Sequence, residues 1–152
     1  MKMKKSVWMM CAGLITAAMM QVSCGGTSEN AEINQLKDET IAVHDEIMPQ
    51  ISSFDRKAIK IDSVLLNLDS LHEANESLDT ATLRSELVQL KSKLEGATDQ
   101  MMQWMMEFDS EHPDKTEEEI KAYYQSELEK VKQMKALFEE VNKESAEKLA
   151  NF

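Results

Sequence analysis

Apolar positions recur every three or four residues along most of this chain, which is the spacing of one buried face of an α-helix. The spacing is sustained over long stretches, as it is in coiled coils and helical bundles. Short polar segments separate three such stretches. The pattern therefore predicts an all-α protein with helices near 29–74, 80–109 and 115–150.

Local signals mark where the second and third helices begin. Asp79 or Thr80 is placed to cap the second helix, because a short polar side chain there accepts hydrogen bonds from free backbone N–H groups. Thr116 and Glu119 have the spacing of a capping box at the start of the third helix. Both signals agree with the boundaries that the apolar spacing predicts.

Two prolines interrupt the pattern. Pro113 predicts a loop between the second and third helices, because the residue before a proline disfavours helical geometry, and we expect His112 in this loop to be solvated. Pro49 lies inside the first helix, where it lacks a backbone donor and crowds the carbonyl of Asp45. We therefore expect the first helix to be kinked or broken near Pro49.

The first predicted helix is longer than the second, and this difference leaves alternatives open. Its portion before about Asp45 would overhang the second helix if it stayed straight. Either Pro49 folds this portion back as a fourth helix, or another copy or a different protein covers it. The predicted fold is an elongated antiparallel three-helix bundle or coiled coil, with a four-helix variant as the alternative.

The amino-terminal residues have a different pattern. Lys2, Lys4 and Lys5 precede an almost uninterrupted apolar stretch over residues 6–20, as in a secretory signal peptide. The stretch is shorter than the roughly 20 apolar residues of a membrane-spanning helix. We therefore predict that residues 1–23 are a signal peptide.

The residues that end this leader, Gln21-Val22-Ser23-Cys24, resemble the cleavage box of bacterial lipoprotein signal peptides. That box is an aliphatic residue and two small residues before a cysteine, and Gln21 stands where leucine is usual. The resemblance implies that Cys24 becomes the acylated first residue, with palmitate as one of its lipids. The residue after Cys24 is Gly25, whereas the inner-membrane retention signal has an aspartate at that position. The absence of this aspartate favours placement at the outer membrane. Ordinary secretion with a free thiol is the alternative.

The remainder of the chain suits one domain. We predict a lipidated tether at 24–29 and a single helical bundle domain at 30–152. The chain has 28 acidic and 17 basic residues, a net charge of -11, which disfavours binding to nucleic acid. It has no glycine-rich phosphate loop, no Gly-x-Ser-x-Gly elbow and no His-Glu-x-x-His pair. We therefore predict that it is not an enzyme and needs no cofactor.

After the predicted signal peptide, methionine is concentrated in one segment, 101–106, which holds four of the six that remain and is the strongest chemical feature of the chain. Tight turns between the helices would set Met48 opposite Met106 and His44 near Ser110, with Met101 level with Tyr124. Imidazole and thioether donors select Cu(I). A metal site is therefore one hypothesis, and its candidate ligands are His44, Met48, Met101 and Met105.

Two other hypotheses explain the same methionines. Methionine commonly fills irregular space in a core, and it is also frequent on adaptable protein-binding surfaces. The residues predicted for such a partner surface are Met102, Trp104 and Met106. The apolar stripe alone does not decide among core, surface and metal site.

The leader, the His-Asp-Glu-Ile-Met-Pro segment at 44–49 and the Met-Met-Gln-Trp-Met run at 101–105 resemble small helical lipoproteins of Bacteroidota labelled "viral A-type inclusion protein". That label reflects coiled-coil similarity and transfers no functional residues. We predict a lipid-anchored lipoprotein of the cell envelope, acting as a structural or protein-interaction module through a protein partner or self-association. The alternative is a periplasmic Cu(I) carrier.

Overall fold

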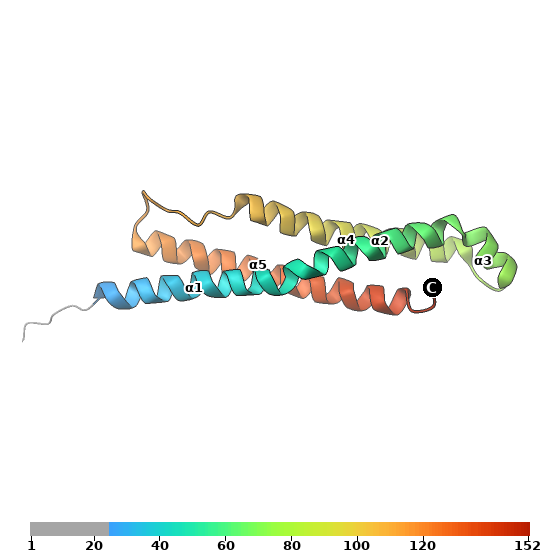
Figure 1. The fold of residues 1–152 in the computed structure, drawn as a ribbon, viewed down its shortest axis with the longest axis horizontal. Helices are drawn as coiled ribbons and strands as arrows, with labels where there is room; N and C mark the ends of the chain where they lie inside the picture. Colours follow the sequence, from blue (N-terminus) through green and yellow to red (C-terminus); the bar gives the residue numbers. More distant parts are fainter. Residues whose placement is uncertain (1–24) are drawn as a thin grey trace, which may run out of the picture.

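The computed structural model describes residues 25–152, and it shows an elongated molecule built from packed helices (Figure 1). No β-strand occurs in this part of the chain. The predicted signal peptide and Cys24 lie outside the described residues. The helices are α1 (Gly25–Ile47), the short 3-10 helix η1 (Met48–Gln50), α2 (Ile51–Leu66), α3 (Leu68–Ala74), α4 (Thr80–Glu107) and α5 (Glu117–Lys148). The predicted all-α bundle is confirmed.

Side-chain caps start the two longest helices, as the sequence predicts. At α4, the Asp79 carboxylate accepts from the backbone N–H of Thr82 at 3.0 Å, and hydrogen bonds from Thr82 hold the pKa of Asp79 below its ordinary value. At α5, the Thr116 hydroxyl accepts from Glu119 N at 3.3 Å, and Glu119 Oε2 accepts from Thr116 N at 2.8 Å. The pKa of Glu119 is lowered by these bonds to Thr116. Each cap satisfies donors that a helix leaves free in its first turn.

The first helical run is broken at two places, of which the sequence predicts one. Pro49 lies in η1 between α1 and α2, and the chain continues in the same general direction (Figure 1). The alternative in which this proline folds the chain back as a fourth helix is therefore wrong. The second break is at Asn67, whose side-chain amide donates to the carbonyl of Ser63 at 2.8 Å. Asparagine competes in this way with the helical hydrogen bonds of the backbone.

The segment predicted as a tether, from Gly25 on, is part of the first helix. α1 begins at Gly25, so the residues after Cys24 that were predicted as a tether are helical. Extending an existing helix by one turn is favoured because each added residue contributes a hydrogen bond without a new nucleation step. The helix therefore starts immediately after the predicted lipid site.

Parallel packing of the first run against α5 organises the molecule. Lys121 donates to Glu32 at 2.7 Å, Lys57 to Ser145 at 2.7 Å, and Lys60 to the carbonyl of Leu149 at 3.2 Å. The partners in these three bonds are 89, 88 and 89 residues apart in sequence. A constant separation over this length means that the two elements stay in parallel register from end to end, across the break at Pro49.

α4 runs in the opposite direction and packs against both α2 and α5 (Figure 1). The segment between Glu107 and Glu117 does not make a tight turn. Phe108 has an extended backbone, and extended chain covers about 3.3 Å per residue where a helix covers about 1.5 Å. The segment therefore carries the chain past the end of α4, so that α5 starts beside α1.

This loop corrects the prediction about the overhang. Asn30 near the start of α1 donates to Glu117 at the start of α5, at 3.1 Å. The portion of α1 before Asp45 is therefore covered by α5 of the same chain, and the predicted need for a second copy or another protein to cover it is wrong.

The core follows the predicted apolar stripes. Phe54 of α2 stacks on Phe138 of α5, with ring centroids 4.8 Å apart, and both side chains are fully buried. The most deeply buried α5 residues include Tyr124, Val131, Phe138, Val141 and Ser145, and those of α4 include Leu87, Leu90, Leu94, Ala97 and Met101. All buried residues lie between Ile33 and Leu149, so the segment 25–152 contains the whole core of the described bundle.

The stacked phenylalanines should contribute strongly to stability. We expect Phe138→Ala in the 25–152 segment to lower the free energy of unfolding by about 3–5 kcal/mol, because it removes a large side chain and leaves a cavity. Urea unfolding followed by far-ultraviolet circular dichroism measures the change. The control is Ile59→Ala on the exposed face of α2, which should change the free energy of unfolding by no more than about 0.5 kcal/mol. Equal effects of both variants would contradict the described core.

Candidate functional site

The site lies where the packing partners change. α1 packs against α5, whereas α2 packs against α4, so the carboxyl ends of α1 and α4 meet near the middle of the molecule without packing closely. His44 of α1 and Trp104 of α4 face each other there, with ring centroids 5.5 Å apart and planes inclined by 34°. The ring of Trp104 also contacts Phe108, at a centroid distance of 4.8 Å.

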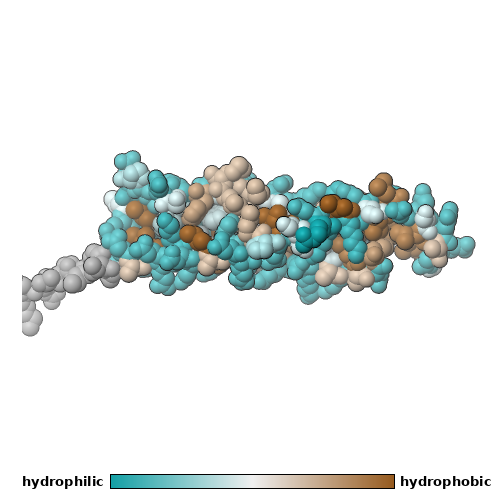
Figure 2. All heavy atoms as spheres, in the orientation of Figure 1, coloured by the Kyte–Doolittle hydropathy of each residue, from teal (hydrophilic) through white to brown (hydrophobic). Residues whose placement is uncertain are grey.

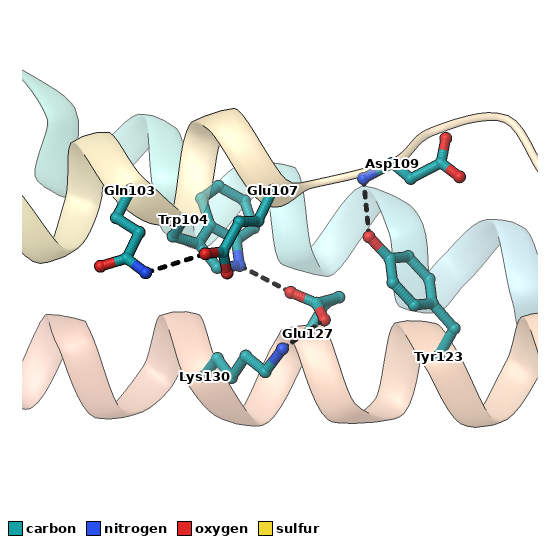
Figure 3. Close-up of polar contacts among 7 residues, drawn as sticks. All are labelled: Gln103, Trp104, Glu107, Asp109, Tyr123, Glu127 and Lys130. Atoms are coloured by element: carbon teal, nitrogen blue, oxygen red, sulfur yellow. Dashed lines mark hydrogen bonds and ion pairs between the residues drawn. The ribbon is translucent and has the colours of Figure 1, made fainter.

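Aromatic side chains continue from this point into the loop before α5. His112 meets Tyr123 edge-on at a centroid distance of 4.6 Å, and Tyr124 at 5.3 Å. Tyr123 Oη accepts from Asp109 N at 2.7 Å, and Tyr124 Oη donates to the carbonyl of Ser110 at 3.4 Å. Burial raises the pKa of both tyrosines. The two tyrosines therefore fasten the loop to α5, and Figure 3 shows the bond to Asp109.

The prediction that His112 is solvated is wrong. Its side chain is only 3% exposed, because the loop lies against the tyrosine rings of α5. Neither ring nitrogen has a hydrogen-bond partner. Nδ1 is 3.5 Å from Asp109 Oδ2, a separation that forms an ion pair only when the imidazole is protonated. The aromatic packing, rather than hydrogen bonding, holds this side chain in place.

A buried carboxylate holds Trp104. Glu127 of α5 is 5% exposed, and its Oε2 accepts from Trp104 Nε1 at 2.8 Å. Its Oε1 accepts from Lys130 Nζ at 2.7 Å, and this hydrogen bond raises the pKa of Lys130 (Figure 3). Both carboxylate oxygens are therefore satisfied, as a buried charge requires. Glu127 was not among the residues predicted from sequence, although it lies three residues after Tyr124 and four before Val131 on the buried face of α5.

Trp104 separates two hollows. The first, which we call the apolar hollow, has a volume of about 290 Å³ and is lined by Ile41, His44, Asp45, Trp104, Met105 and Phe108. The second has a volume of about 270 Å³ and is lined mainly by polar side chains, namely Gln100, Gln103, Glu107, Lys130 and Gln133, together with Trp104 and Met134. The bond to Glu127 fixes the indole and so fixes the wall that the two hollows share.

Exposed apolar side chains lie on the same segments of α1 and α4 that line the apolar hollow, and two of them, Ile41 and Met105, line it. Met106 is 80% exposed, Met102 45%, Met105 39% and Ile41 37%. Figure 2 shows a pale-brown prominence over the end of α4 among hydrophilic surroundings. We call these four residues the methionine surface. Large exposed apolar groups gathered in one place are typical of a binding surface.

The predicted partner surface is only partly as expected. Met102 and Met106 are exposed, but Trp104 is 8% exposed and belongs to the buried wall of the hollows. Its indole N–H is bound by Glu127, which the sequence pattern did not reveal.

The predicted metal ligands lie in different environments. His44 and Met105 line the apolar hollow together. Met48 is partly buried against the core, and Met101 is fully buried within it. No group of three or more His, Cys, Asp and Glu side chains in residues 25–152 is placed to hold a metal ion.

The expected helix register was also wrong beside α5. Trp104 of α4 lies level with Glu127 of α5, whereas the prediction set Met101 level with Tyr124. Between α1 and α4, His44 faces Trp104 and not Ser110. The extended loop displaces α5 relative to α4, whereas the prediction assumed a tight turn at His112.

Comparison of the chain with protein-family models, with curated proteins and with solved structures gives no match. Within residues 25–152, every helix is too short or too polar to cross a lipid bilayer.

The Trp104–Glu127 bond should be measurable in stability. We expect Glu127→Ala in the 25–152 segment to lower the free energy of unfolding by about 1–3 kcal/mol, because it leaves the buried indole N–H without an acceptor. Glu127→Gln keeps a carbonyl oxygen that accepts from that N–H, so it should lower the free energy of unfolding by less. Glu129→Ala, at an exposed position on the same helix, is the control. Urea unfolding curves in which Glu127→Ala matches the control would contradict a structural role for the bond.

Proposed function

We propose that this protein is a lipid-anchored lipoprotein of the cell envelope, held at the outer membrane through Cys24, and that its helical bundle is a protein-interaction module. The leader and the residues around Cys24 support the anchor. The proposed role is binding, without catalysis.

The methionine surface is the observation that carries this proposal. It gathers exposed apolar side chains beside the apolar hollow on a chain of strongly acidic composition. Methionine is unbranched and flexible, so such a surface adapts to the side chains of a partner. The fixed wall at Trp104 gives the hollow a constant shape beneath the flexible thioethers.

Charge indicates the kind of partner. Among the residues that line the apolar hollow, Asp45 is acidic and none is lysine or arginine. Asp38 lies one turn before Ile41 on α1, and Asp109 follows Phe108 at the end of α4. Two copies of a chain with a net charge of -11 repel each other. We therefore assign the surface to a different protein that presents an amphipathic helix with an apolar face and basic flanks.

The anchor is tested in a Gram-negative host that expresses the full chain. We expect Cys24→Ser to abolish incorporation of labelled palmitate, because the acylated thiol is lost. Cys11→Ser, which alters the other cysteine of the chain, is the matched control and should still be labelled. Palmitate labelling that survives in Cys24→Ser would overturn the assignment of the lipid site.

The contact surface is tested with a fluorescent amphipathic helical peptide of leucine and lysine. We expect saturable binding to the 25–152 segment in an anisotropy titration, and about tenfold weaker binding when Met102→Ser and Met106→Ser are combined. The matched control combines Ile59→Ser and Leu66→Ser, which remove exposed apolar side chains from α2 and should leave the affinity unchanged.

Two results would contradict this surface. The first is equal binding of a peptide in which glutamate replaces lysine, because the charge argument would then fail. The second is concentration-dependent dimerisation in sedimentation that the methionine substitutions abolish, because a second copy would then be the occupant.

A further inference from the structure

His44 offers a ligand atom that no group in residues 25–152 uses. Its Nδ1 lies 2.9 Å from Asp45 Oδ1, and its Nε2 is buried without a hydrogen-bond partner. A carboxylate only accepts, so the neutral imidazole carries its proton on Nδ1 and keeps a free electron pair on Nε2. A carboxylate that holds the other ring nitrogen is the usual arrangement behind a metal-binding histidine.

A soft metal ligand, a methionine thioether, lies near this imidazole. Met105 lines the same apolar hollow, and its thioether sits on a flexible chain that is partly exposed. The ring of Trp104 lies 5.5 Å from the ring of His44 and lines the same hollow. The only carboxylate lining the hollow, that of Asp45, is engaged with Nδ1.

We propose that the apolar hollow is a Cu(I) site in which His44 Nε2 and Met105 Sδ are the ligands and Asp45 orients the imidazole. Imidazole with thioether selects Cu(I), whereas Zn²⁺, Ca²⁺ and Mg²⁺ need thiolate, additional imidazole or several oxygen ligands. The described residues offer no such cluster. The site differs from the set predicted from sequence, because Met101 is buried in the core outside the hollow.

The site is tested on the 25–152 segment, which contains the whole core and neither cysteine of the chain. Cu(I), kept reduced under anaerobic conditions, is titrated against the chelator bicinchoninate. We expect the segment to withdraw one equivalent of Cu(I) from the chelator. Tryptophan fluorescence should fall in the same titration, because Trp104 lines the hollow and is the only tryptophan of this segment.

Single substitutions separate this site from general methionine binding. Met105→Leu and His44→Leu should each lower Cu(I) affinity ~10-fold or more. Met102→Leu, an exposed neighbour outside the hollow, and Met101→Leu, in the core, should keep the affinity of the parent segment. Circular dichroism of each variant establishes that the helices are intact before affinities are compared.

The proposal is overturned if Met105→Leu binds Cu(I) as tightly as the parent segment, or if Met102→Leu weakens binding equally. In the second case the metal would be held by the exposed methionines and not by the hollow. The peptide titration contains no metal and the metal titration contains no peptide, so failure of this site leaves the interaction proposal standing, and the reverse also holds.

Discussion

The parallel register between the first helical run and α5 is the constraint on which the rest of this structure depends. Parallel helices need a connection that carries the chain back along the bundle, and α4 together with the extended segment after it provides that return. The bonds from Lys121 to Glu32 and from Lys57 to Ser145 are individually weak, because they lie at least partly in water. Their regular spacing nevertheless fixes which residues of α5 face α1. The core and the site both follow from this alignment.

The break at η1 lies where the first helical run changes its closest packing partner. Pro49 does not reverse the chain, but it lies between α1, which packs mainly against α5, and α2, which packs closely against α4 and also stacks Phe54 on Phe138 of α5. The first run crosses α5 near this point and continues beside α4 (Figure 1). The apolar hollow between α1 and α4 is a result of that change. The proline therefore matters to the site through geometry, without contributing a side chain to it.

Much of the fold is predictable from local pattern, because helices depend on spacing and caps that are written in neighbouring residues. The stripe through Tyr124, Val131 and Phe138 is buried as predicted, and Asp79 and Thr116 cap the expected helices. These signals require no knowledge of distant contacts.

The errors arise where a distant partner decides the outcome. Pro113 predicts a loop, but only the bonds from the loop to Tyr123 and Tyr124 make that loop extended and place α5 beside α1. Glu127 is a charged residue, which predicts an exposed position, and only its distant partner, the indole N–H of Trp104, accounts for its burial. For the same reason the candidate metal ligands were identified by residue type, whereas their separation into core and hollow needed the structure.

The start of α1 at Gly25 also sets the position of the apolar hollow along the bundle. α1 begins at Gly25, directly after the proposed lipid site, and His44 lies nineteen residues further along. At about 1.5 Å per residue, the apolar hollow lies roughly 30 Å along α1 from Gly25. A flexible tether would let the hollow take many positions relative to Gly25, whereas a continuous helix holds it at a nearly fixed distance from that residue. Whatever binds the methionine surface must therefore reach it from the side of the bundle, at that distance from the end of α1.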